Sequence, residues 1–143
     1  ACTDIAQGAR QAGVADVDGF LVTEMCRADA ELILGIQRDP DFGPLVMVGA
    51  GGVLVELMKD VQLAPAPLSH ASARAMLLRL RSLPLLTGFR GRAPADLDAI
   101  ADVLVRLGAL AAHPDARVQE LDINPLFVAG NRVIAADARA MLR

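Results

Sequence analysis

The stretch Gln119–Arg139, QELDINPLFVAGNRVIAADAR, carries most of the information about the fold. Two apolar runs flank a Gly-Asn turn signal, and this pattern predicts strands over 117–128 and 132–139 joined by a hairpin loop. We expect the loop to hold the four residues 129–132, which fixes how the two strands are paired. The hairpin therefore sets the frame for the rest of the chain.

The same hairpin places oxygen-bearing side chains next to one another. Asp122 and Asn124 alternate with apolar residues, so they share one face of the first strand. A four-residue loop pairs Val128 with Val133, and continuing that ladder sets Asn124 opposite Asp137. Cross-strand neighbours lie about 4.5–5.5 Å apart at Cβ, so we expect the Asn124 amide and the Asp137 carboxylate to converge.

Two interpretations of these converging oxygens stay open at this point. Carboxylate and amide oxygens suit Mg²⁺, which takes one or two protein carboxylates together with waters and substrate phosphates. Such a metal ion would stabilise charge on a phosphoryl group in transfer. The other interpretation is a solvated polar face, or a turn that begins at Asn124-Pro125. Pro125 also weakens the assumed pairing, because proline donates no hydrogen bond to a ladder and is typical of edges and bulges.

Outside the hairpin, the chain predicts a mixture of strands and helices. Apolar runs bounded by turn residues predict further strands over 19–26, 30–39, 45–49 and 53–61. Helices are predicted over 4–12, after Ser69, and after Asp96 as far as Pro114. Between them, 63–68 predicts a break and 85–96 a Gly/Arg-rich connection. The order of elements indicates an α+β fold, with a mainly antiparallel sheet and helices packed on one face.

Composition argues against several classes of function. The 143 residues carry a net charge of −3 without a Lys/Arg cluster, so a nucleic-acid partner is not expected. The charge-free run 42–55 is too short for a membrane span, and no signal peptide is evident. Cys2 and Cys26 lack zinc spacing and indicate reduced thiols of a cytoplasmic protein, with a disulfide between them as the open alternative. The chain lacks an initiator Met, so it was processed or cut from something longer.

Several motifs, taken together, resemble one family. The segments GFLVTEMC (19–26), LPLLTGFRGRAPADLDAI (83–100) and VQELDINPLFV (118–128) are similar to the C-terminal lobe of the ATP-grasp domain of NDP-forming acyl-CoA synthetases. So is the longer segment AELILGIQRDPDFGPLVMVGAGGVLVELMKDV (30–61). The ADP-forming acetyl-CoA synthetases belong to this family, and the β subunit of succinyl-CoA synthetase is a more distant relative. The resemblance implies that 1–18 is the tail of a preceding segment or a linker helix, and that 19–143 is the lobe itself.

The resemblance implies a magnesium site in the hairpin. In these enzymes an Asn in an (E/D)-I-N-P-L segment and an Asp in a following L-D-(A/G) segment bind the nucleotide's Mg²⁺. The matching residues are Asn124, in DINPL, and Asp137, in AADAR. The register argument above reaches the same pair without the family. Asp122 occupies the acidic position beside the Asn and is a second metal candidate, whereas Glu120 is expected to be structural or solvent-facing.

The resemblance also implies contacts to ATP or ADP. LVTEM matches the family's hinge segment, which makes Glu24, Met25 and Cys26 candidate adenine contacts. Extended backbone at a hinge offers an N–H donor and a C=O acceptor that can read the edge of adenine. Taken alone, LVTEM is more often an ordinary buried strand with one polar residue. Glu31 matches the acidic residue of E-L-x-x-G and is expected to bond ribose hydroxyls or to order the hinge, unless it is a surface carboxylate at a strand end.

Other motifs are given no chemical role. GAGG (49–52) matches neither glycine-rich phosphate-loop pattern, and a tight turn is the favoured interpretation. In the family, the phosphate cover and its lysine come from the other lobe, so Lys59 and Arg90 remain candidates without a role. His70 and His113 are expected on the surface, because the resemblance implies that the phosphorylated histidine belongs to another domain.

The resemblance implies that the intact enzyme interconverts acyl-CoA, ADP and phosphate with acid, CoA and ATP through that phosphohistidine. The N-terminal lobe and the CoA-binding and phosphohistidine domains would be partners, in the same chain or in another subunit. Alone, the chain is expected to be inactive, and apolar surface facing the missing lobe would favour self-association. Two alternatives stay open: a regulatory module that senses nucleotide or acyl-CoA and is fused to an acetyltransferase, and a purely structural assembly domain.

Overall fold

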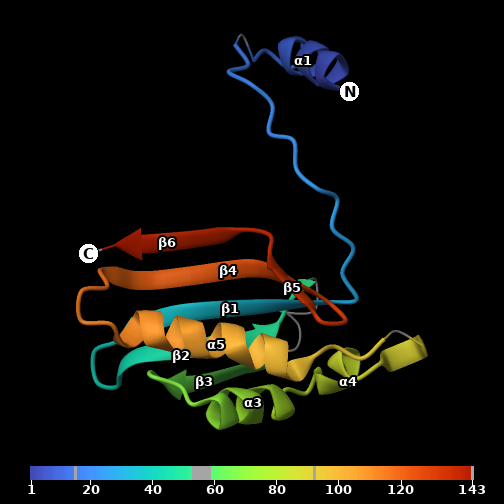
Figure 1. Cartoon of the computed structure of the whole chain (residues 1–143). Helices are drawn as coiled ribbons and strands as arrows, with labels where there is room; N and C mark the ends of the chain where they lie inside the picture. The colour runs from blue at the N-terminus through green and yellow to red at the C-terminus, as the bar shows by residue number, and fades with distance from the viewer. Residues whose placement is uncertain (15, 53–58, 92, 143) are drawn as a thin grey trace.

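The computed structural model describes residues 1–14, 16–52, 59–91 and 93–142. A six-stranded sheet has the order β3-β2-β1-β4-β5, and β6 also pairs with β4 (Figure 1). The strands are β1 (Ala30–Asp39), β2 (Gly43–Ala50), β3 (Val61–Pro65), β4 (Val118–Ala129), β5 (Arg132–Ala135) and β6 (Ala138–Leu142). The helices are α1 (Cys2–Gln11), α3 (His70–Leu78), α4 (Leu83–Leu86), the 3-10 helix η2 (Phe89–Gly91) and α5 (Leu97–Ala112).

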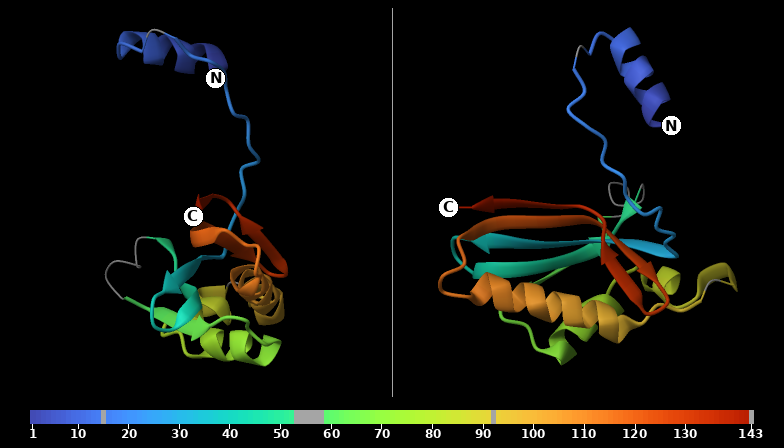
Figure 2. Two further views of the ribbon diagram at one scale, coloured as in Figure 1. Left: turned by 90° about the vertical axis from the view of Figure 1, so that its left-hand side faces the viewer. Right: turned by 45° about the horizontal axis from the view of Figure 1, so that its top comes forward.

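The core lies between the sheet and the helices α3 and α5, which pack on one of its faces (Figures 1 and 2). Alternate residues of β1 and β4 turn toward these helices, and they pair as Leu32 with Leu126 and Leu34 with Ile123. All four are buried, as is Leu104 of α5. Full burial of each such side chain contributes roughly 1.5–3 kcal/mol. The predicted α+β class, with an antiparallel sheet and helices on one face, is confirmed.

The opposite face of the sheet, turned away from α3 and α5, is called the outer face below. It carries the residues that alternate with the core positions, because successive side chains of a strand point to opposite faces. Paired positions on the outer face join β1 to β4 as Glu31 with Phe127, Gly35 with Asp122 and Gln37 with Glu120. Most of the residues proposed from the sequence to bind ligands lie on this face or border it.

Both predicted helix caps are present. The Ser69 hydroxyl accepts a hydrogen bond from a backbone N–H three residues on, and the Asp96 carboxylate accepts two at the start of α5. These acceptors satisfy N–H groups that have no partner inside the helix. α5 ends at Ala112, two residues before Pro114, as predicted. No helix in the described parts of the chain has the length and apolarity that a membrane crossing requires.

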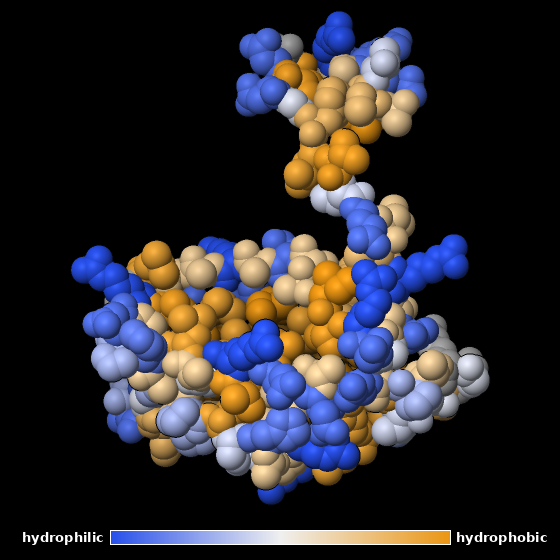
Figure 3. Space-filling model, in the orientation of Figure 1, coloured by the Kyte–Doolittle hydropathy of each residue, from blue (hydrophilic) through white to orange (hydrophobic). Residues whose placement is uncertain are grey.

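The predicted strand over 19–26 is wrong. Residues 16–29 form neither helix nor strand and run as an extended segment from α1 to β1 (Figure 1). The side chains of Leu21, Val22 and Met25 are 91%, 85% and 92% exposed, and α1 buries none of its residues (Figure 3). An apolar segment becomes a strand only when a neighbouring strand completes its hydrogen bonds. The described part of the chain offers this segment no such neighbour.

Two strand boundaries also differ from the prediction. The strand expected over 132–139 is two strands, β5 and β6, which both pair with β4 and are separated by Ala136 and Asp137. The break expected over 63–68 begins too early, because β3 continues to Pro65. β3 is an edge strand, where proline is tolerated. Most of the strand expected over 53–61 falls on 53–58, which lie outside the described residues.

Candidate functional site

Asn124 and Asp137 lie side by side where β5 gives way to β6. The Asn124 N–H donates to the Asp137 carbonyl oxygen at 3.2 Å, and the Ala136 N–H donates to the Pro125 carbonyl oxygen at 3.0 Å. One Asp137 carboxylate oxygen accepts from the N–H of the next residue at 2.8 Å, which leaves the other oxygen for a ligand. The neighbourhood predicted from the hairpin register is therefore present in the backbone.

A bulge in β4 accompanies this contact. Between the pairs Leu32–Leu126 and Leu34–Ile123, β1 contributes one residue while β4 contributes two, Asn124 and Pro125. The irregularity expected at this proline is thus observed. Bulges bend a strand and redirect a side chain, and they are common next to binding sites. Asn124 is exposed at this bend, whereas Ile123 and Leu126 on either side are buried.

Asp122 lies further along the same strand. It stands opposite Arg139 of β6, and both line a cavity of about 130 Å³ together with Glu120 and Met141. Within the described residues, no group of three or more His, Cys, Asp and Glu side chains is arranged to hold a metal ion. An amide and one or two carboxylates fit Mg²⁺, which takes its remaining ligands from phosphates and water.

The hinge candidates lie across the outer face of the β4–β5 hairpin. They line a cavity of about 250 Å³, and its walls are formed by Glu24, Met25, Cys26, Arg27, Phe127, Ala129, Arg132 and Ile134. The Glu24 carboxylate lies 3.8 Å from the Arg132 guanidinium. Although 19–26 is no strand, its last residues are therefore brought to the sheet, and they meet two apolar side chains, Phe127 and Ile134.

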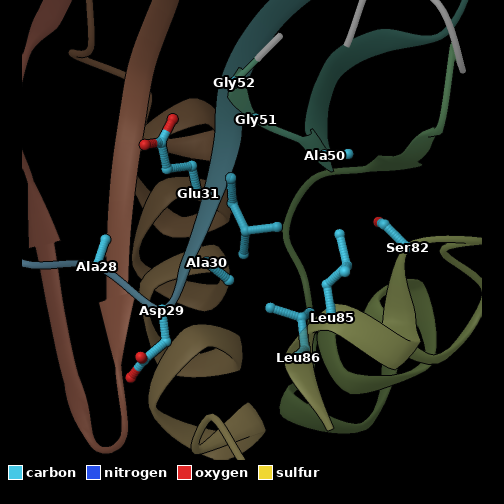
Figure 4. A pocket seen from close by; sticks show the side chains of 11 residues that line it. Ala28, Asp29, Ala30, Glu31, Ala50, Gly51, Gly52, Ser82, Leu85 and Leu86 are labelled. Carbon is cyan, nitrogen blue, oxygen red and sulfur yellow. The ribbon is translucent and has the colours of Figure 1, made fainter. Parts of the chain in front are cut away.

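Glu31 borders the same region from β1. It pairs with Phe127, which in turn pairs with Ile134 of β5, so the three form one row across the outer face. The Glu31 carboxylate points away from Leu85 and Leu86 in Figure 4. Those leucines line a separate cavity of about 330 Å³, which lies between the ends of β1 and β2 and α4. Of the candidate residues, only Glu31 also borders that cavity.

Two glycines of GAGG, Gly51 and Gly52, lie against Glu31. The sequence interpretation did not predict this contact. The Gly51 N–H donates to the Glu31 carbonyl oxygen at 2.7 Å. A Cβ at Gly51 would lie 2.7 Å from the Glu31 carbonyl carbon, and one at Gly52 would lie 3.2 Å from its carboxylate. Gly52 also has φ +71°, which favours glycine. Instead of a tight turn at 49–52, Gly49 and Ala50 still belong to β2.

The outer face thus has two chemically different ends. Phe127 and Ile134 form an apolar floor under the hinge residues, and Asn124 with Asp137 lies three residues away along β4, about 10 Å at about 3.4 Å per residue. The sequence interpretation did not name Phe127, Ile134 or Arg132, and strict alternation from Asn124 would have placed Phe127 on the opposite face, because only the bulge brings it to this one. His70 and His113 are exposed, as predicted.

A family model describing ATP-grasp domains matches residues 1–142. This chain belongs to the ATP-grasp family. Within that family, the β subunit of ADP-forming acetate–CoA ligase I from Pyrococcus furiosus is 41% identical over 129 residues, which are 90% of this chain and 55% of that protein. ADP-forming acetate–CoA ligase I from Archaeoglobus fulgidus is 43% identical, over 90% of this chain and 18% of that protein. This ATP-grasp chain therefore spans about half, or a smaller part, of these relatives.

Solved structures of relatives share the ATP-grasp fold of this chain. Acetyl-coenzyme A synthetase 1 of Ca. Korarchaeum cryptofilum, in complex with coenzyme A, acetyl-coenzyme A and a phosphorylated phosphohistidine segment, matches with a TM-score of 0.86 and 39% identity over 99% of this chain and 63% of that one. The same enzyme in complex with coenzyme A and Mg-AMPPCP matches with a TM-score of 0.78 and 43% identity, over 82% of this chain and 55% of that one.

Proposed function

We propose that this ATP-grasp chain binds ATP or ADP with Mg²⁺ and serves phosphoryl transfer in an ADP-forming acyl-CoA synthetase. The contact between Asn124 and Asp137 on the outer face carries the proposal, because it sets hard oxygens about 10 Å along the strand from an apolar pocket. The ligase names of the relatives favour this function over a sensing or purely structural module.

Asn124 and Asp137 would hold Mg²⁺, and Asp122 would be a second ligand or would bind one of its waters. The metal ion would neutralise charge that develops on the phosphates. In phosphoryl transfer the protein contributes mainly positioning and charge stabilisation. The residues of this chain would therefore orient the nucleotide and leave the bond-making atoms to the nucleotide and to a histidine.

Adenine would lie in the cavity of about 250 Å³ beneath the hinge residues. The extended backbone of Glu24, Met25 and Cys26 would offer it donors and acceptors, while Phe127 and Ile134 would contact its ring. Glu31, at the end of the same row, would accept hydrogen bonds from ribose hydroxyls. Base and sugar would then lie along the row of Ile134, Phe127 and Glu31, and the phosphates would follow β4 toward Asn124.

The whole enzyme would convert acyl-CoA, ADP and phosphate to acid, CoA and ATP, in the cytoplasm. Residues 1–18 would end a preceding segment and 19–143 would form the C-terminal lobe. The other ATP-grasp lobe would cover the outer face, and a CoA-binding part would deliver the phosphohistidine. Leu21, Val22 and Met25, which are exposed here, would contact that lobe or would cause self-association in its absence.

Calorimetry on the complete protein tests this function. We expect ADP to bind only with Mg²⁺, and we expect Asn124→Ala with Asp137→Ala to weaken binding by more than about tenfold, roughly 1.4 kcal/mol. Asn131→Ala with Asp115→Ala is a matched control, because both residues are exposed and line none of the three cavities described above. Binding that does not need Mg²⁺, or that the double variant retains, would contradict the proposal.

A further inference from the structure

Arg139 is a cation among carboxylates on the outer face. It stands opposite Asp122 in the ladder between β4 and β6, and it follows Asp137 by two residues, which sets both on one side of an extended chain. It is exposed and lines the cavity of about 130 Å³ with Asp122, Glu120 and Met141. The described residues give its guanidinium neither a hydrogen bond nor an ion pair.

Two other arginines of the sheet have partners. Arg38 donates to the carbonyl oxygens of Val118 and Ala111 at 2.7 and 3.0 Å, which joins the end of β1 to the end of α5. Arg132 lies near Glu24. Among the residues that the structure describes, Arg139 has no partner although a carboxylate stands directly across the ladder, so no structural ion pair with them explains its position.

The order of charges on this face suits a ligand that carries both signs. Asp137 and Asn124 offer oxygens to a cation, and Arg139 offers a planar fork of N–H donors to an anion. Arginine forms bidentate hydrogen bonds with phosphate, which are stronger than those between neutral groups. A metal ion bound to a phosphate chain therefore satisfies both groups at once, whereas a metal or an anion alone satisfies one of them.

The position of Arg139 along the strand indicates which phosphate it would contact. The hinge cavity lies at Phe127, Asn124 follows three residues on, and Asp122, with Arg139 opposite, is two residues further. At about 3.4 Å per residue, Arg139 lies about 7 Å beyond the metal pair, away from the adenine end. Resting on the proposed nucleotide site, we propose that Arg139 binds the phosphoryl group that is transferred, beyond the two phosphates that ADP keeps.

The chemical step balances without a further reagent. When ATP forms, an oxygen of the ADP β-phosphate attacks phosphorus, a P–O bond forms, and the P–N bond to the imidazole breaks. The electron pair of that bond returns to the ring nitrogen, and the imidazole leaves neutral if its other nitrogen keeps its proton. Arg139 gives up no proton. It stabilises negative charge on the oxygens of the moving group, a contribution that arginines make in other phosphoryl transfers.

The test compares a diphosphate with a triphosphate in the complete protein. For Arg139→Ala we expect Mg-ADP affinity within about threefold of wild type, but at least about tenfold weaker binding of Mg-AMPPCP, since only the latter has the third phosphate. We expect kcat for ATP formation to fall by at least about 100-fold. Arg139→Lys should recover part of both losses, because it restores charge without the bidentate fork. Inorganic phosphate added together with Mg-ADP should strengthen the binding of Mg-ADP to wild type but not to Arg139→Ala.

Arg106→Ala serves as the control, because Arg106 is an exposed arginine on α5, on the helix side of the sheet. Thermal unfolding of the variants, including Arg139→Gln, distinguishes a loss of function from a loss of folding. Equal weakening of Mg-ADP and Mg-AMPPCP, or unchanged binding and kcat, would overturn the role of Arg139 while wild-type binding still supports the nucleotide site. Wild-type protein that binds neither nucleotide would overturn both proposals.

Discussion

The Asn124 N–H donates to the Asp137 carbonyl oxygen at 3.2 Å, which brings the backbones of an asparagine and an aspartate together at one point of the sheet. Asp137→Asn keeps the size of the side chain but removes its charge. We expect the Mg²⁺ concentration for half-maximal ADP binding to rise about tenfold, roughly 1.4 kcal/mol. Nucleotide titrations at several Mg²⁺ concentrations measure this shift. Asp115→Asn is the control, and an unshifted Mg²⁺ dependence would remove Asp137 from the metal site.

The ion pair between Glu24 and Arg132 makes a small contribution to placing the hinge residues. The two groups lie 3.8 Å apart, and their side chains are 72% and 64% exposed, so the pair contributes at most about 1 kcal/mol. Glu24→Arg should weaken ADP binding by no more than about fivefold. Adding Arg132→Glu should restore affinity, and the restoration should fade at 1 M salt. If the loss of ADP affinity in the double variant equals the sum of the losses in the two single variants, the two charges do not interact.

Gly51 is required by the backbone of Glu31. Its Cβ position lies 2.7 Å from the Glu31 carbonyl carbon, and backbone cannot move aside as a side chain can. Gly51→Ala should lower the free energy of unfolding by about 1–3 kcal/mol and should also weaken nucleotide binding. Urea unfolding checks the first effect and calorimetry the second. Gly19→Ala, where nothing lies within 4 Å, should change neither.

Asp60 makes stability depend on pH. Burial raises the pKa of this carboxyl, but hydrogen bonds from Ser82 and from the Arg81 backbone N–H outweigh burial, so the pKa lies below its usual value. The folded state then binds fewer protons, and the contribution of Asp60 is complete above the unfolded pKa of about 3.9. It is lost as pH falls through the lower, folded pKa. Urea unfolding between about pH 6 and pH 3 should show a wild-type advantage over Asp60→Asn that shrinks in acid.

Local signals in the sequence were sufficient for much of the fold. Ser69 and Asp96 mark the starts of helices, because their side-chain oxygens accept hydrogen bonds from backbone N–H groups that have no partner inside the helix. This capping interaction needs no contact with distant parts of the chain. The short turn after Ala129 fixes the register between β4 and β5 and likewise needs no distant partner. That register, continued along the strands, brings Asn124 next to Asp137. These are interactions between residues close in the chain.

The features that the sequence did not predict correctly depend on contacts between residues far apart in the chain. Leu21 and Val22 carry a strand-like pattern, but whether such a segment pairs is decided by a neighbour, and none is present in the described residues. The cavity walls at Phe127 and Ile134 could not be assigned, since their meeting with Met25 joins residues about one hundred positions apart. The sequence predicts a turn at Gly51, because the contact of Gly51 with Glu31 depends on the register of β1 and β2.

The bulge at Asn124 and Pro125 has a consequence for the length of β4. Before it, odd-numbered residues such as Leu121 and Ile123 face the helices, and after it, even-numbered ones such as Leu126 do. Removing one residue there would leave a single residue opposite Ile33 and restore strict alternation, with Ile123 and Leu126 both still facing the helices; what would be lost is the bend that exposes Asn124. Side chains on the outer face can be exchanged without touching the packing. The core packing therefore tolerates one residue fewer between Ile123 and Leu126, whereas the exposed position of Asn124 does not, so homologous strands that keep this site should also keep the extra residue.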